Sequence, residues 1–249
     1  MKRRLSRAKA KIKVTAIPFA VPADRLLPGR LAAVLAVIYL IFNQGYTDRG
    51  DLAAEAIRLG QLLAELMADE PEVYGLLALM LLHGSRRDAR VVDGQLVPLA
   101  EQDRSRHDRA KVEAGRAALT RALALRPAAG PYVLQAAIAS LQAEEEVDWD
   151  EVAMLYERLE RLTGSPVVAL NRAVAIAEAG APERALELVD SLELGDYRYL
   201  HSTRAELLRR LGRQEEARAA FEHALRLATT DPERRFLARR LAGLTPSPS

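Results

Sequence analysis

Apolar residues recur every three or four positions along nearly the whole chain, which is the spacing of one face of an α-helix. Ala, Leu, Glu and Arg, which favour helices, fill many of the remaining positions. No segment alternates apolar and polar residues as a half-buried strand does. Gly and Pro separate the helical segments, so the pattern predicts an all-α protein of about a dozen helices. The clearest segments are 30–42, 52–67, 73–82, 113–125 and 132–142.

The helical pattern repeats in the C-terminal half at an interval of 32 residues. Three positions recur at this offset: Ala173 as Ala205, Ala185 as Ala217, and Val189 as Phe221. Small residues where two helices cross, followed by a bulky residue, are typical of tetratricopeptide repeats of about 34 residues. Residues 132–163, and a segment ending at Pro127, are interpreted as degenerate units. We therefore expect a helical-hairpin array, with a tetratricopeptide-like superhelix in the C-terminal half.

Three regions follow from these patterns. Residues 1–22 are basic, residues 23–129 form a helical domain, and residues 130–249 hold the repeats and a C-terminal helix. The helical domain contains a long loop at 91–102, where Asp93-Gly94 predicts a tight turn. Loops of this length usually have a function. We expect this loop to project from the helical stack.

Composition restricts the class of protein. An apolar content of 49% is enough for a substantial core. The absence of Cys excludes disulfides, thiolate metal sites and cysteine nucleophiles, and fits a cytoplasmic protein. The longest apolar stretch, residues 31–42, is too short to span a membrane and too far from the N-terminus to be a signal peptide. We predict a cytoplasmic protein that does not associate with membranes.

The positive charge is concentrated at the N-terminus. Residues 1–13 carry seven Lys or Arg and no acidic residue. Since the whole chain has a net charge of +2, the rest carries −5. Basic side chains of this kind contact DNA phosphates, which positions a protein without reading base sequence. We expect weak, salt-dependent DNA binding without promoter preference, through Arg3, Arg4, Arg7, Lys9 and Lys11.

Motifs for catalysis or metal binding are missing from the sequence. The four histidines, His83, His107, His201 and His223, stand apart without metal-ligand spacing. The chain has no glycine-rich phosphate loop, nucleophile elbow or dinucleotide fingerprint. The acidic run at 144–146 is interpreted as a solvated loop, followed by a helix N-cap at Asp148. We predict no enzymatic activity, no cofactor and no metal.

Nine polar residues interrupt apolar helical patterns or flank them: Asn43, Gln44, Tyr46, Gln102, Asp103, Arg104, Gln135, Asn171 and Arg172. Such side chains can cap neighbouring helix ends and fix packing, which is the interpretation we favour. The alternative is a surface for a ligand or partner. One hypothesis is that Gln102, Asp103 and Arg104 hold the long loop against the helix ending at 43–46.

A tetratricopeptide groove would be lined by the first helix of each pair. In this chain those helices carry Asn171 and Arg172 in one unit, and Arg204 and Glu206 in the next. Side chains of these types can hold an extended peptide by its backbone. Peptide binding and simple bracing of the groove both remain open for these four residues.

Six segments carry a resemblance: YLIFNQGY at 39–46, LMLLHGSRRDAR at 79–90, EQDRSRHDR at 101–109, GPYVLQAAIA at 130–139, PVVALNRAVA at 166–175 and RRFLARRL at 234–241. In this order they resemble the C-terminal extension of one group of bacterial extracytoplasmic-function (ECF) sigma factors. RRLSRAKAKI at 3–12 resembles the end of the promoter-reading helix-turn-helix of sigma region 4. The chain departs from the family pattern at Gln44, Glu101 and His107, where the family usually has Glu, Asp and Trp.

The resemblance implies that sigma regions precede Met1 in a longer protein. The chain would then be a non-catalytic regulatory and interaction domain that acts in transcription initiation. Its expected partners are RNA polymerase and the upstream sigma domains, with promoter DNA contacted only through the missing regions; homodimer formation is a further option. One alternative is a free-standing tetratricopeptide adaptor that binds a peptide. Another is a ligand-sensing or hydrolytic helical domain that uses residues 102–104.

Overall fold

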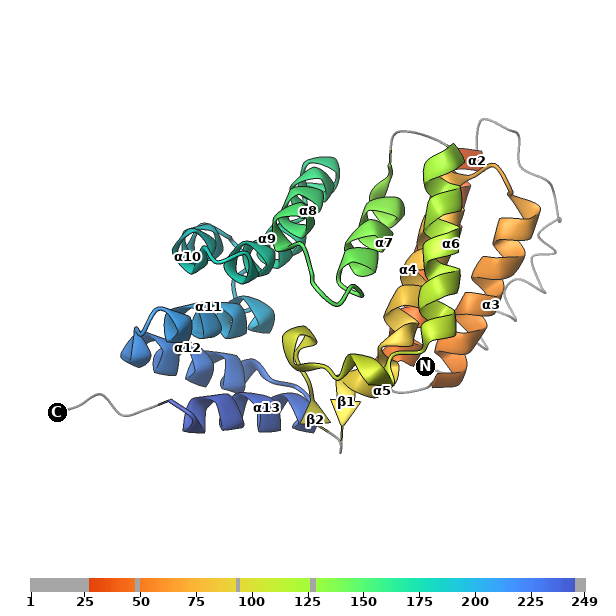
Figure 1. The fold of residues 1–249 in the computed structure, drawn as a ribbon. Helices are drawn as coiled ribbons and strands as arrows, with labels where there is room; N and C mark the ends of the chain where they lie inside the picture. The colour runs from red at the N-terminus through yellow and green to blue at the C-terminus, as the bar shows by residue number, and fades with distance from the viewer. Residues whose placement is uncertain (1–26, 48–49, 93–94, 126–128, 245–249) are drawn as a thin grey trace, which may run out of the picture. The chain divides into compact units, whose positions relative to one another are not determined.

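A computed structural model describes residues 27–47, 50–92, 95–125 and 129–244 (Figure 1). Residues 27–37 form the N-terminal part of helix α2, and the described residues from 38 to 244 belong to one compact unit. The basic residues Arg3, Arg4, Arg7, Lys9 and Lys11, and the turn at 93–94, lie outside the described ranges. The described chain is almost entirely helical, which confirms the predicted all-α fold and its helical hairpins.

The α-helices are α2 (Leu27–Thr47), α3 (Gly50–Leu66), α4 (Pro71–Ser85), α5 (Arg87–Arg90), α6 (Arg109–Leu125), α7 (Pro131–Leu141), α8 (Trp149–Thr163), α9 (Pro166–Glu178), α10 (Pro182–Asp190), α11 (Arg198–Arg210), α12 (Gln214–Leu227) and α13 (Asp231–Ala242). Two short strands, β1 (Val91–Val92) and β2 (Gln95–Leu96), and two 3-10 helices, η2 (Leu99–Glu101) and η3 (Arg104–Arg106), lie between α5 and α6. None of the helices in the described ranges is both long and apolar enough to cross a membrane.

Helix α4 is the buried centre of the first half of this unit. A helix that is apolar on all sides needs neighbours on all sides, and α4 packs against α3, α6 and α7. Gly75 allows α7 to approach closely, because a Cβ at this position would lie 2.6 Å from the backbone nitrogen of Val133. The α4 side chains that are almost completely buried include Val73, Leu76, Leu79, Met80 and Leu82.

The 32-residue repeat corresponds to two helical hairpins, α9–α10 and α11–α12. The residues that recur are all core residues: Ala173, Ala185, Val189, Ala205, Ala217 and Phe221 are each at most 1% exposed. Alanine at these positions lets the helices pack closely, and the bulky residue fills the space beside them. Figure 1 shows α11 and α12 side by side, with α13 packed against α12.

The turns of the two hairpins are equivalent in detail. Gly180 and Gly212 have φ angles of +94° and +74°, in the left-handed region that favours glycine. The N–H group of Ala181 donates to a carbonyl in the last turn of α9, as Arg213 does to Leu208 in α11. These bonds satisfy carbonyls at the helix end. The repeat therefore extends to backbone hydrogen bonds.

The predicted N-cap at Asp148 is confirmed. Its Oδ1 atom accepts a hydrogen bond of 2.9 Å from the N–H group of Glu151, in the first turn of α8. Helix α8 ends at Gly164, whose φ of +62° is again left-handed. Helix α13 begins with a capping box formed by Thr230 and Glu233.

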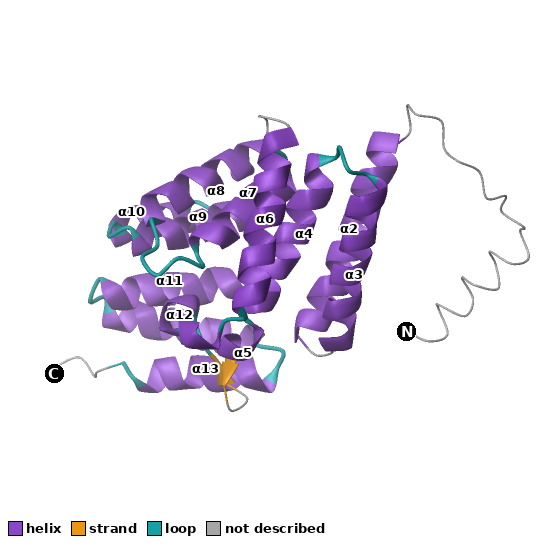
Figure 2. Cartoon of the chain, turned by 45° about the vertical axis from the view of Figure 1, so that its right-hand side comes forward, coloured by secondary structure: helices purple, strands orange, loops and turns teal. Residues whose placement is uncertain are grey.

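The prediction that residues 91–102 project from the stack is wrong. Strands β1 and β2 pair antiparallel, with Val91 opposite Leu96, and β2 packs against α13 (Figure 2). Further along, Glu101 forms an ion pair with Arg240 of α13. Two-residue strands are too short to produce a visible alternation, so the sequence indicated a turn at 93–94 but not the strands on either side of it.

Candidate functional site

A cavity of about 460 Å³ lies within the repeat half of the chain. We call it the repeat cavity. It is lined mainly by the first helices of the hairpins, α9 and α11, and by the segment 98–101, α8 and α13. Its lining includes Leu99, Glu101, Trp149, Tyr156, Asn171, Val174, Glu178, Ser202, Glu206, Arg209, Arg210, Phe236 and Arg240.

The charged side chains of the repeat cavity are paired with one another. Glu206 forms an ion pair of 2.6 Å with Arg209, and further ion pairs join Glu178 to Arg210 and Glu101 to Arg240. Burial alone would raise the pKa of Glu206, but the hydrogen bond from Arg209 and nearby guanidinium charges lower it overall. Three acidic and three basic side chains therefore leave the wall close to neutral.

Uncharged hydrogen-bonding groups complete the wall. The side chain of Asn171 makes no hydrogen bond to the described residues, so its amide can bond a ligand. Burial raises the pKa of Tyr156 to about 12, so its hydroxyl stays protonated. Ser202 and Trp149 add a hydroxyl and an indole. A neutral wall with both donors and acceptors suits a neutral polar ligand, such as a peptide backbone.

Two of the four groove residues proposed from the sequence line this cavity, and two do not. Asn171 and Glu206 line it. Arg172 instead forms an ion pair of 3.1 Å with Glu160 of α8, and Arg204 bonds an aspartate of α10 at 2.7 Å. Neighbouring helices hold the guanidinium groups of these two arginines, which favours bracing over peptide contact for both residues.

A second cavity, of about 590 Å³, adjoins the repeat cavity and shares part of its wall: Pro98, Leu99, Gln142, Ser202 and Phe236 line both. We call it the arginine cavity. Three arginines and a histidine line it, and no Asp or Glu is among the described residues of its wall. Its lining includes Tyr39, Asn43, His83, Arg86, Arg90, Leu99, Gln102, Arg198, Tyr199 and Phe236. Burial, and then the charges of Arg86 and Arg90, lower the pKa of His83 to about 3.

The polar residues 43–46 and 102–104 have different positions. Asn43 and Gln102 line the same cavity, as expected if the loop contacts the end of α2. Gln44 is exposed, and Tyr46 lies in the last turn of α2. Asp103 is exposed and caps η3. Its Oδ1 atom accepts hydrogen bonds of 2.9 and 2.7 Å from the backbone N–H and the hydroxyl of Ser105.

Asp103 therefore does not hold the loop against the end of α2, contrary to the hypothesis drawn from the sequence. Local hydrogen bonds satisfy the carboxylate and lower its pKa. The Nη1 atom of Arg104 is buried without a hydrogen-bond partner in the described part of the chain. Gln135 also bonds locally, donating to the carbonyl of Pro131 at 3.1 Å within α7. This last contact agrees with the structural interpretation of Gln135.

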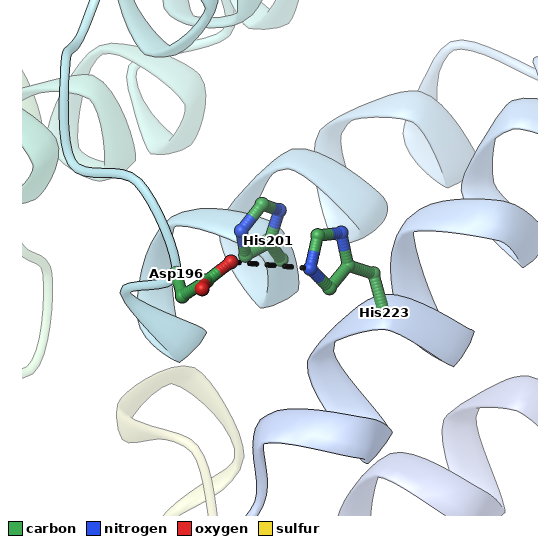
Figure 3. A group of neighbouring side chains, drawn as sticks. All are labelled: Asp196, His201 and His223. Atoms are coloured by element: carbon green, nitrogen blue, oxygen red, sulfur yellow. Dashed lines mark ion pairs between the residues drawn. The ribbon is translucent and has the colours of Figure 1, made fainter.

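Two histidines that stand apart in the sequence come together in the fold (Figure 3). His201 of α11 and His223 of α12 stack with ring centroids 3.9 Å apart, and His223 Nε2 lies 3.7 Å from Asp196 Oδ1. The ligand atoms of the three residues lie within 4.8 Å of one another. A metal ion needs ring lone pairs that converge on one point, whereas stacked rings direct them side by side. Cation binding would require one ring to rotate.

The fold is an array of helical hairpins with a tetratricopeptide-like arrangement. The crystal structure of a thermophilic tetratricopeptide protein from Thermus thermophilus is similar, with a TM-score of 0.54. The match covers 84% of this chain and 96% of that one, at 20% identity, which shows the shared fold alone.

The sequence comparisons give two further similarities. Residues 30–123 match DUF6596, a family of unknown function. An uncharacterized protein of Rhizobium meliloti (strain 1021) is 43% identical over the whole of this chain. The chain spans 62% of the length of that relative.

Sequence reasoning missed most of the arginine cavity. Arg86 and Arg90 stand near a helix end, where basic residues usually complement the helix dipole and face solvent. Arg198 lies over 100 residues further along the chain. A usable signal was the scarcity of aromatics, at 5% of the chain. Because the chain has few aromatic residues, those that lie outside the core can indicate a cavity. Trp149 lines the repeat cavity, and Phe236 lines both cavities.

Proposed function

We propose that this chain is a non-catalytic regulatory and interaction domain of an ECF sigma factor. It acts in the cytoplasm, in transcription initiation, through contacts with sigma domains or RNA polymerase. The six matching segments support the sigma-factor context, and the repeat cavity is the observation that carries the interaction role. The basic segment at residues 1–13, outside the described ranges, adds weak contacts to DNA phosphates.

The repeat cavity supports the binding of an extended segment of a partner protein. Its wall is neutral and offers the unbonded amide of Asn171 beside the partly exposed Val174. The chain's own residues 98–101 already lie along one side. Pro98 there has φ −56° and ψ 151°, the conformation of polyproline II helix. The three residues that follow form the 3-10 helix η2, so the cavity already lies against a non-α-helical segment of backbone.

A partner joined to the same polypeptide needs little intrinsic affinity. Flexible tethering gives an effective concentration of about a millimolar, so weak backbone contacts are sufficient. The Rhizobium relative is longer than this chain, which is compatible with additional domains in proteins of this kind. Sigma domains encoded in the same reading frame are therefore the favoured occupants, and RNA polymerase is the next.

Isothermal titration calorimetry tests the proposal. Separately expressed upstream sigma domains, or RNA polymerase core enzyme, are titrated into this chain. We expect binding that weakens at least fivefold in Asn171→Ala. Gln61→Ala is the matched control, because Gln61 is an exposed amide on α3, outside the cavity. Absence of binding to both partners would contradict the proposal. Binding to unrelated peptides alone would favour a free-standing adaptor.

A further inference from the structure

We propose that the arginine cavity binds a small organic anion, a carboxylate or phosphate ester with an apolar body and a hydrogen-bond donor. This inference goes beyond the proposed function. It concerns the arginine cavity, which adjoins the repeat cavity and shares part of its wall, including Leu99 and Phe236. Three features of the cavity support it: the charge of the wall, its apolar surface and one buried unpaired acceptor.

The wall carries positive charge that the described residues only partly balance. Arg198 is paired with Glu233 at 2.6 Å and stacks on the ring of Tyr199 at 3.8 Å. Arg86 has no such carboxylate partner among the described residues. Arg90 adds a third guanidinium group to the same cavity. Like charges gathered in a concave, partly desolvated site repel one another, and the site attracts counter-ions.

The ionisation of His83 agrees with a positive potential in this cavity. Burial and the neighbouring Arg86 and Arg90 lower its pKa to about 3, so the ring is neutral at pH 7. An anion bound between these groups would oppose the two guanidinium charges. It would therefore raise the pKa of His83, which provides a readout within the cavity itself.

The cavity also has the size and surface of a small-molecule site. Its volume of about 590 Å³ falls in the range of such pockets. The rings of Tyr39, Tyr199 and Phe236, and the side chain of Leu99, provide apolar surface beside the arginines. Arginine at one part of the wall and aromatic rings at another select an anion with an apolar body over a bare inorganic ion.

Gln102 supplies the unpaired acceptor. Its Nε2 atom donates to the carbonyl of Val97 at 3.0 Å, which fixes the orientation of the amide. The Oε1 atom consequently points the other way, where it is buried without a partner in the described part of the chain. A buried acceptor left unbonded costs stability. A hydroxyl or amino group on the ligand would satisfy it.

The cavity collects segments that lie far apart in the sequence. Its lining residues come mainly from α2, α4, α5, α11 and α13 and from the segment 97–102. Packing alone does not require arginines from separate helices to face one space. Their convergence is what a binding site for an anion requires.

Calorimetry with small probes tests the inference. Inorganic phosphate, phenyl phosphate, 4-hydroxybenzoate and the neutral benzyl alcohol are titrated into the whole chain at pH 7. We expect saturable binding of phenyl phosphate or 4-hydroxybenzoate, weaker binding of inorganic phosphate and none of benzyl alcohol. Arg86→Gln should weaken the tightest probe at least tenfold. Arg158→Gln, an exposed arginine of α8, is the matched control and should bind as the wild type does.

A second measurement uses the wild-type protein, so it does not depend on the folding of a variant. NMR of labelled His83 should show its pKa rise when the tightest probe is added. The inference is overturned if neither organic anion saturates below about 10 mM, where binding free energies fall under about 3 kcal/mol. It is equally overturned if Arg86→Gln binds as tightly as Arg158→Gln, or if His83 does not respond.

Discussion

Glu101 and Arg240 form an ion pair that joins the 3-10 helix η2 to the C-terminal helix α13. The two residues are 139 positions apart in the sequence. Both line the repeat cavity, and the neighbouring residues Pro98 and Leu99 line both cavities. The ion pair therefore ties a wall that the two cavities share to the C-terminal helix.

Arg240→Ala should release the segment 97–101 with little change in global stability. Both side chains are partly exposed, and such ion pairs contribute under about 1 kcal/mol. Hydrogen exchange of the amides at 99–102 should become faster, while the melting temperature stays nearly constant. Arg234→Ala is the control, because Arg234 pairs within the first turn of α13. Unchanged exchange in Arg240→Ala would show that other contacts hold the segment.

Gly75→Ala should destabilise the protein by about 1–3 kcal/mol, because the new Cβ would lie 2.6 Å from the backbone of α7. A rigid backbone cannot move aside as a side-chain end can. Gly84→Ala, in the same helix, meets only contacts of 3.6 Å or longer and should change stability by less than about 1 kcal/mol. Urea unfolding distinguishes the two. Equal effects would mean that α4 and α7 are not as close as described.

Glu72→Ala should cost about 1–2 kcal/mol through loss of a helix cap. The carboxylate of this α4 residue accepts hydrogen bonds of 2.9 and 3.2 Å from the N–H groups of Tyr132 and Val133, at the start of α7. Asp103→Ala removes a cap from the exposed three-residue η3, and should cost clearly less than Glu72→Ala does. Thermal melts compare them. A larger loss in Asp103→Ala would restore a structural role for that residue in fixing the loop.

His83 should make stability fall in mild acid. Its folded-state pKa is lowered from 6.5 to about 3, so the unfolded chain binds a proton that the folded chain excludes. Stability is then fully present above pH 6.5 and is lost as the pH falls, by up to about 2 kcal/mol at pH 5. His107, whose pKa burial also lowers, adds to the loss in the same direction.

Thermal melts at pH 7 and pH 5 check this prediction. His83→Gln should lose less stability between the two values than the wild type does. Because only the difference between the two pH values is compared, a constant cost of the substitution cancels. Equal losses in both proteins would assign the acid sensitivity to other groups.

The sequence was sufficient for elements that depend on local chemistry. Ala173 and Ala205, 32 positions apart, predicted where the helices of each hairpin cross. Two helices that pack closely leave room only for small side chains at the crossing point. Asp148 predicted a helix start because an N-cap acts within three residues. These features depend on neighbours that the sequence itself specifies.

Features that depend on distant partners were not predictable. Arg172 and Asn171 are adjacent, yet one pairs with Glu160 of α8 and the other lines a cavity, because successive residues of a helix point about 100° apart. The two histidines of Figure 3 are 22 positions apart and meet only because α11 packs on α12. The repeat predicted that these two helices form a hairpin, but not which side chains of each helix meet.

The central claim is that the repeat cavity holds a segment of a sigma domain or of RNA polymerase. Site-specific photo-crosslinking tests it most directly. A benzophenone amino acid replaces Val174, which lines the cavity and is 37% exposed, or Met154, a 58% exposed residue of α8 outside it. We predict crosslinks to sigma domains or polymerase from position 174 and few or none from position 154. Absence of crosslinks from position 174, or equal crosslinking from both positions, would contradict the claim.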